Sequence, residues 1–168
     1  RVGCGASGYK GSMGARYLII GGGLAAAQAI EGIREHDRDA PITLVTEEDH
    51  LPYERPPLSK DVLLGTAGID AVFPHPPGWY AEQGVIPLIG DPVVALDASG
   101  RTATLRGGTE LSWDRALLAT GSAVRTLRVP GAHLPGIHYL RTVDESLSLR
   151  EALGDGRDVV VVGGGWIG

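Results

Sequence analysis

The feature that most constrains the fold is a short apolar segment, residues 17–20, that ends in Gly21-Gly22-Gly23. A short apolar run bounded by glycines is typical of a buried parallel strand. Over residues 24–35 the apolar residues recur at helical spacing, and several alanines favour a helix. Pro41 breaks this pattern, and residues 42–45 predict a second strand. Strand, turn, helix and strand in about thirty residues predict a βαβ unit.

The turn between the first strand and the helix, residues 21–26, fits the pattern G-x-G-x-x-G/A. In this pattern Gly21 permits the tight turn, Gly23 lets the backbone approach a diphosphate, and Ala26 lets the helix pack closely. The helix N-terminal amides, which include those of Leu24 and Ala25, hold the negative charge. The alternative is a tight packing turn without a ligand, because glycine and alanine are common in this chain. The flanking strand and helix favour a dinucleotide site.

A carboxylate that could bind a ribose follows the second strand. Glu47 lies near the offset of about 20 residues at which such an acid is expected. Its neighbour Glu48 is the alternative, and the spacing favours Glu47.

The end of the chain repeats its beginning. A valine-rich run at residues 158–162 predicts a strand, and residues 163–168 again fit G-x-G-x-x-G with Gly163, Gly165 and Gly168. No helix or acid follows to support this second turn, so a packing turn is again the alternative. Two such units predict two dinucleotides and electron transfer between them.

Between the two turns the chain alternates loops and short elements. We expect proline-rich loops, short helices, an antiparallel meander of three strands, one further strand and a longer helix. In chain order these are loop 51–60, helical turn 61–64, loop 73–78, helix 79–83, strands 93–97, 102–106, 109–113 and 115–119, and helix 143–153.

Composition excludes several other classes. Cys4 is the single cysteine, so no disulfide, Cys-x-x-Cys pair or cysteine-based metal site forms within this chain. The five histidines show no ligand spacing, and we expect no metal site. The net charge of −5 and the absence of a basic run argue against nucleic acid as a partner. No apolar run approaches the length of a membrane span, and no signal-peptide pattern opens the chain, so we expect a cytoplasmic protein with no membrane partner.

Four blocks, in this order, carry a family resemblance: residues 18–27, Pro52-Tyr-Glu-Arg-Pro-Pro-Leu-Ser-Lys60, residues 118–121 and residues 160–168. Together they resemble the FAD-dependent pyridine nucleotide-disulfide oxidoreductases, specifically the ferredoxin and rubredoxin reductase branch. That branch includes bacterial oxygenase reductases and apoptosis-inducing-factor-like proteins. The resemblance implies an α/β fold: a Rossmann-like FAD-binding domain with a parallel sheet and an antiparallel meander, then the truncated start of a second, NAD(P)-binding Rossmann domain.

The resemblance also implies roles for individual residues. Gly21, Gly23 and Ala25 would lie against the FAD pyrophosphate, and Glu47 would bind the adenosine ribose. The remaining FAD contacts would be Arg55 toward the pyrophosphate, Lys60 toward the flavin ring, Val93 at the adenine through its backbone, Ala119-Thr120-Gly121 beside the flavin, and Arg141. Gly163, Gly165 and Gly168 would open the NAD(P) site. For Arg55 and Lys60 the alternative is a solvated loop cation.

The implied activity is electron transfer from NAD(P)H through FAD to an iron–sulfur protein, a ferredoxin or a rubredoxin. Lys60 is the one candidate for a residue that tunes the flavin. The redox cysteine pair of the disulfide reductases is absent, which favours electron transfer by the flavin alone. Two alternatives stay open. One is another flavoenzyme, such as an NADH oxidase, a nitrite reductase subunit or a monooxygenase, and the other is a non-catalytic dinucleotide-binding module.

The expected domain organisation follows. Residues 1–12 are expected to be a disordered or non-native extension, residues 13–122 the first segment of the FAD-binding domain, residues 123–157 a connecting segment, and residues 158–168 the start of the NAD(P)-binding domain. The resemblance places further segments beyond Gly168, so the chain by itself is expected to be inactive. The choice between NADH and NADPH, the acceptor and the oligomeric state are not encoded in these residues.

Overall fold

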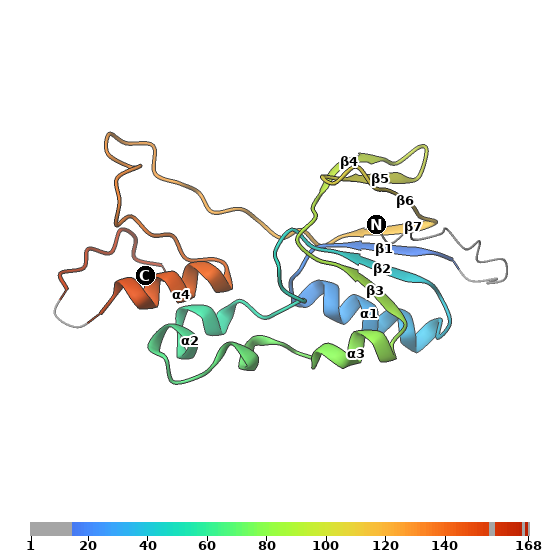
Figure 1. Ribbon diagram of the computed structural model, residues 1–168, viewed down its shortest axis with the longest axis horizontal. Coiled ribbons are helices and arrows are strands. Elements are labelled where there is room, and N and C mark those ends of the chain that lie inside the picture. The colour runs from blue at the N-terminus through green and yellow to red at the C-terminus, as the bar shows by residue number, and fades with distance from the viewer. Residues whose placement is uncertain (1–14, 155–156, 166, 168) are drawn as a thin grey trace, which may run out of the picture. The chain divides into compact units, whose positions relative to one another are not determined.

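The computed structural model describes residues 15–154, 157–165 and 167 (Figure 1). The chain divides into two compact units. Unit 1 comprises Arg1–Leu51 and His75–Thr120, and unit 2 comprises Pro52–Pro74 and Gly121–Gly168. The predicted extension at residues 1–12 lies outside the described residues.

Unit 1 is built on a parallel sheet with the strand order β3-β2-β1-β7. The register pairs Tyr17 of β1 with Ile42 of β2 and with Arg115 of β7. The carboxyl ends of these three strands therefore lie level, and the loops that follow them leave from one edge of the sheet. The strands are β1 (Tyr17–Ile20), β2 (Ile42–Val45), β3 (Val85–Leu88) and β7 (Arg115–Leu118).

Both faces of this sheet are covered, because successive side chains of a strand point to opposite faces. Ile19 packs with residues of α1 (Leu24–His36) and α3 (Pro77–Glu82) in a core that we call the helix-side core. Its neighbours Leu18 and Ile20 pack in another core with the antiparallel sheet β4-β5-β6. Figure 1 shows α1 and α3 on one side of the parallel sheet and the antiparallel sheet on the other. The meander strands are β4 (Val93–Asp97), β5 (Thr102–Leu105) and β6 (Glu110–Ser112). The predicted α/β class, with a parallel sheet and an antiparallel meander, is confirmed.

Unit 2 packs a short-helix segment against a longer helix. Its core contains Tyr53, Leu58, Val62, Val72 and Val143, all at most 2% exposed. The elements are η1 (Pro56–Ser59), α2 (Asp61–Leu64), η2 (Ile69–Val72) and α4 (Val143–Ala152). A capping box between Thr142 and Glu145 starts α4, and this motif satisfies two amide groups at the helix N-terminus.

Several features differ from the sequence-based expectations. Strand β3 was not predicted, since it is short and contains Pro87, a residue that a sheet tolerates at an edge strand. Helix α3 begins at Pro77, two residues before the predicted start. The strand predicted at residues 158–162 is not formed, and Val160 is 88% exposed. A strand needs neighbours to satisfy its backbone groups, and none pairs with this segment among the described residues.

Tyr80 of α3 is 1% exposed, and its hydroxyl has no hydrogen-bond partner among the described residues. Burial, with a contribution from Glu31, raises the pKa of the Tyr80 phenol to about 12. A buried hydroxyl without a partner destabilises the folded state by about 1 kcal/mol or more. We therefore expect Tyr80→Phe to raise the free energy of unfolding by about 1 kcal/mol in urea denaturation of the complete gene product. The matched control is Tyr53→Phe, which should destabilise because the Tyr53 hydroxyl accepts two hydrogen bonds. A destabilised Tyr80→Phe variant would contradict this reading.

At the amino end of β1, Arg16 and Asp114 form a bidentate ion pair. Arg16 Nε lies 3.0 Å from Asp114 Oδ2, and Arg16 Nη2 lies 3.1 Å from Oδ1. The hydrogen bonds from Arg16, with its charge, lower the pKa of Asp114 to about 2. Because the folded-state pKa is depressed, the stabilisation is complete above the ordinary pKa of about 4 and is lost as pH falls toward 2.

We expect Asp114→Asn to lower the urea midpoint at pH 6 by a small amount, since both partners are partly exposed. The difference from the wild type should shrink as pH falls below 4. Urea midpoints measured at half-unit steps of pH check this expectation. A difference that stays constant down to the acid-unfolding limit would rule out the ion pair as its source.

Candidate functional site

The turn after β1 leaves no room for a side chain at Gly21. Its φ is +139°, a region that favours glycine. A Cβ added there would overlap the Ala119 carbonyl oxygen and lie 2.5 Å from the carbonyl carbon. The turn is also fixed by the adjoining strands, because the Gly21 amide donates to Val45 O at 2.8 Å and the Ala119 amide donates to Ile20 O at 2.8 Å. The backbones of the turn and of the loop after β7 are therefore in direct contact.

The next two glycines have different surroundings. A Cβ on Gly22 would meet the Thr46 hydroxyl, so packing within the chain accounts for that glycine. A Cβ on Gly23 would meet nothing within 4 Å. Gly23 has φ −108° and ψ 179°, which any residue adopts. The chain's own packing thus does not require glycine at position 23, and the space above it is open to a ligand.

Gly23 is the N-cap of α1, and the first turn of the helix carries no acidic residue. The amides of Ala26 and Ala27 donate to Gly23 O, whereas the first amides of any helix have no acceptor within it. The first amides of the helix, which lack an acceptor within it, give its N-terminus a positive partial charge. Leu24 is partly exposed, Ala25 is exposed and Ala26 is fully buried in the helix-side core. An uncompensated, accessible helix N-terminus of this kind binds phosphate groups.

Two acidic residues follow the end of β2. The Glu47 side chain is 73% exposed, and its Oε1 lies 3.5 Å from Arg106 Nη2. The Arg106 side chain is 64% exposed, so the pair is a weak surface contact that a ligand can displace. Glu48 is partly buried, and its amide donates to Thr46 Oγ1 at 3.3 Å. Of the two carboxylates, that of Glu47 is the more accessible.

The other residues predicted for unit 1 lie on β4 and after β7. Val93 opens β4, pairs with Leu105 and borders an irregularity in the strand register. Ala119 packs on the helix-side core, and Thr120 is exposed. The structure thus brings Gly21 and Ala119 together, and it places Val93 in the meander.

In unit 2 the structure brings Arg55, Arg141 and Gly121 together. Arg55 Nη1 donates to Arg141 O at 2.7 Å. Arg141 Nη2 lies 3.2 Å from the position of a Cβ on Gly121, whose φ is +66°. Lys60 is exposed and is the N-cap of α2, and its amide donates to Pro57 O at 3.0 Å. The sequence-based reasoning missed Tyr53, whose hydroxyl accepts from Arg55 Nη1 at 2.8 Å. Its position beside the proline-rich motif was the only available signal.

The second glycine turn is only partly described. Gly163 has φ +125°, and a Cβ on either Gly163 or Gly165 would meet nothing within 4 Å. Gly168 lies outside the described residues.

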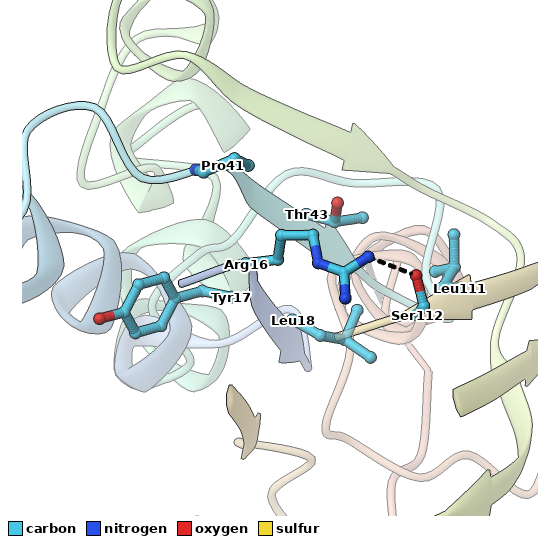
Figure 2. Close-up of a pocket in the computed structure, with 7 residues that line it drawn as sticks. All are labelled: Arg16, Tyr17, Leu18, Pro41, Thr43, Leu111 and Ser112. Carbon is cyan, nitrogen blue, oxygen red and sulfur yellow. Dashed lines mark hydrogen bonds between the residues drawn. The ribbon is translucent and has the colours of Figure 1, made fainter. Parts of the chain in front are cut away.

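At the amino end of β1, away from these loops, is a cavity of about 80 Å³ (Figure 2). It is lined by Arg16, Tyr17, Leu18, Pro41, Thr43, Leu111 and Ser112. Ligand pockets usually measure about 300 Å³ or more, so this cavity is too small for a dinucleotide. Its one charged side chain, that of Arg16, is already bound to Ser112 and Asp114.

Neither a metal cluster nor a membrane-spanning helix is found in residues 15–154, 157–165 and 167. These residues contain no cluster of three or more His, Cys, Asp or Glu side chains suited to a metal ion. Their helices include none that is long and apolar enough to span a membrane.

Comparison with known proteins gives consistent matches. The family model described as pyridine nucleotide-disulphide oxidoreductase matches residues 15–168. The chain is 41% identical, over 152 residues, to the ferredoxin–NAD(+) reductase component of the anthranilate 1,2-dioxygenase system of Burkholderia cepacia. That match covers 90% of this chain and 37% of the relative.

Solved structures agree. A ferredoxin reductase for the CYP199A2 system from Rhodopseudomonas palustris matches with a TM-score of 0.76 and 38% identity, over 81% of this chain and 33% of that one. The covalent complex of putidaredoxin reductase with putidaredoxin matches with a TM-score of 0.74 and 31% identity, over 82% of this chain and 34% of that one. The chain therefore spans about a third of the length of the relatives it matches.

Proposed function

Because the chain belongs to the pyridine nucleotide-disulphide oxidoreductase family, we propose that it forms the FAD-binding part of an NAD(P)H-dependent electron-transfer reductase. The proposed acceptor is an iron–sulfur protein of the ferredoxin or rubredoxin type. The observation that carries the proposal is the helix N-terminus at Gly23, which is open to a ligand and has no acidic residue in its first turn.

The residues of unit 1 fit a dinucleotide. The amides of residues 21–26 are proposed to hold the diphosphate, because the space above Gly23 is open and the helix end is positive. Glu47 is proposed to accept hydrogen bonds from the ribose hydroxyls, which its exposure allows. Val93 is proposed to contact the adenine through its backbone, and Ala119 and Thr120 to lie beside the flavin.

From unit 2 we propose Arg55, Lys60, Gly121 and Arg141 as further residues of the FAD site. When bound, FAD would accept two electrons from NAD(P)H and pass them one at a time to an iron–sulfur centre. The chain's contribution is orientation and charge. Lys60 is exposed, and we propose that its ammonium lies near the flavin ring. A positive charge there would stabilise the reduced, negatively charged form of the flavin.

Gly163, Gly165 and Gly168 are proposed to begin the NAD(P) site. The proposed domains are residues 13–122 and 158–168, joined by residues 123–157. A cytoplasmic location is part of the proposal, since it supplies NAD(P)H as electron donor.

The test is an anaerobic absorption experiment on the complete gene product. We expect oxidised flavin bands that bleach on addition of NADH or NADPH, and one-electron reduction of an added ferredoxin or rubredoxin. Bleaching with no reduction of either acceptor, together with rapid oxygen consumption in a parallel aerobic assay, would favour an oxidase or monooxygenase. Bound FAD without any NAD(P)H turnover would favour a non-catalytic dinucleotide-binding module, and a colourless protein that binds no added FAD would overturn the proposal.

A further inference from the structure

One guanidinium nitrogen of Arg55, in unit 2, donates both to its own segment and to the segment that leads into α4. Its Nη1 donates to the Tyr53 hydroxyl at 2.8 Å and to Arg141 O at 2.7 Å. The Arg55 Cζ lies 4.9 Å from the centroid of the Tyr53 ring, within the range of a cation–π contact. Tyr53 is 1% exposed, so this anchor belongs to the core of the unit. The Arg55 guanidinium is thus held by a rigid aromatic residue.

The backbone that carries Arg141 is fixed on both sides by side chains. The Arg141 amide donates to Glu145 Oε2 at 2.8 Å, while its carbonyl accepts from Arg55. The Val143 amide, two residues on, donates to the Tyr53 hydroxyl at 3.2 Å. The hydrogen bond from Arg55 to the Arg141 carbonyl is charge-assisted, and its donor lies outside α4. Charge-assisted hydrogen bonds are among the strongest in proteins.

The Arg141 side chain lies against a backbone without a side chain. Its Nη2 is 3.2 Å from where a Cβ of Gly121 would stand, so an added Cβ at position 121 would push the guanidinium aside by a few tenths of an ångström. The position of the Arg141 guanidinium therefore depends on Gly121, which it contacts, and on the Arg141 backbone, which is held by Arg55 and Glu145.

We propose that Arg55 is a positioning residue: by holding the Arg141 carbonyl, it aims the Arg141 guanidinium at the FAD. This inference rests on the proposed function, in which Arg141 contacts FAD, and it assigns to Arg55 an action through Arg141 in place of an independent contact.

A double-mutant cycle on the complete gene product tests the proposal. The measured quantity is the Kd of FAD for the apoprotein, followed by flavin fluorescence. We expect Arg141→Ala to weaken binding by about thirtyfold and Arg55→Ala by about tenfold, the range of one charged hydrogen bond. In the double variant we expect no more than the loss of Arg141→Ala alone, because Arg55 has nothing left to position. Arg55→Lys should recover part of the affinity, since an ammonium can donate to the same two oxygens.

The matched control is Arg150→Ala. Arg150 also donates a guanidinium hydrogen bond to a backbone carbonyl in unit 2, that of Val62 at 3.1 Å. It should change the Kd by less than twofold, which separates positioning from a general loss of packing. The visible circular dichroism of the bound flavin should change alike in Arg55→Ala and Arg141→Ala, and not in Arg150→Ala.

Multiplicative losses in the double variant, about three-hundredfold, would overturn the inference and assign Arg55 an independent contact with FAD. An unchanged Kd in Arg55→Ala would overturn it as well. If Arg55→Ala does not fold, the comparison of Arg55→Lys with and without Arg141→Ala decides in the same way. Failure of the proposed function is recognised separately, since the wild-type apoprotein would then bind no FAD.

Discussion

Replacing Gly21 by alanine is expected to remove FAD binding from the complete gene product and to destabilise its fold by about 3 kcal/mol or more. The added Cβ would collide with the backbone of Ala119, which cannot rotate away as a side chain can. The backbone at position 21 also has φ +139°, which strains any residue except glycine. Either the turn or the loop after β7 must move, and both belong to the proposed site. Urea denaturation and the FAD content of the purified protein measure the two effects.

The matched control is Gly32→Ala, within α1. A Cβ at position 32 meets nothing within 4 Å, and alanine favours a helix more than glycine does. We expect this variant to raise the free energy of unfolding by about 0.5–1 kcal/mol and to keep its FAD. A Gly21→Ala variant as stable as the wild type would show that the two loops do not meet as described.

Replacing Gly23 by aspartate is expected to leave the fold intact and to weaken FAD binding at least about a hundredfold. Gly23 is the N-cap of α1 in an extended conformation, and aspartate is a preferred N-cap residue. The fold therefore tolerates the substitution or gains from it. The new carboxylate would stand in the open space above the helix end, where it would repel a diphosphate and satisfy the amides proposed to bind it. Titration of the apoprotein with FAD measures the loss.

Gly23→Asn separates charge from volume in this experiment. Asparagine has nearly the same size and also caps helices, but it carries no charge. We expect Gly23→Asn to retain at least tenfold more affinity for FAD than Gly23→Asp at low salt, and the gap to narrow as salt screens the charge. Equal affinities for FAD in the wild type and Gly23→Asp would place the diphosphate elsewhere.

Local patterns were enough to predict much of unit 1. Three patterns depend only on neighbouring residues: the apolar run before Gly21, the alanine-rich helical spacing after Gly23, and the strand that ends before Glu47. The structure contains β1, α1 and β2 at these places. The meander was equally local, because its strands are joined by short glycine-containing turns. The contact between Gly21 and the backbone of Ala119 is different, since it joins positions 98 residues apart that meet only through strand register.

The features that the sequence did not reveal depend on partners far along the chain. Strand β3 forms because β2 provides a pairing edge, although Pro87 disfavours a strand. The association of residues 52–74 with α4 depends on contacts such as Ser146 Oγ to Leu58 O, at 2.7 Å. Tyr53 gains its role only when Arg55 and Val143 reach its hydroxyl. The valine run at residues 158–162 has strand-forming residues and no pairing edge among the described residues, so its local preference was not sufficient.

In the proposed function, the backbone turn after β1 holds a dinucleotide by its diphosphate. Calorimetric titration of the apoprotein of the complete gene product with FAD and with riboflavin, which has the same ring system and no phosphate, measures what the diphosphate contributes to binding. We predict that FAD binds at least about a hundredfold more tightly than riboflavin, because the parts that the helix N-terminus and Glu47 are proposed to contact are those that riboflavin lacks. Equal affinities for the two compounds, or no binding of FAD at all, would contradict diphosphate binding by this turn.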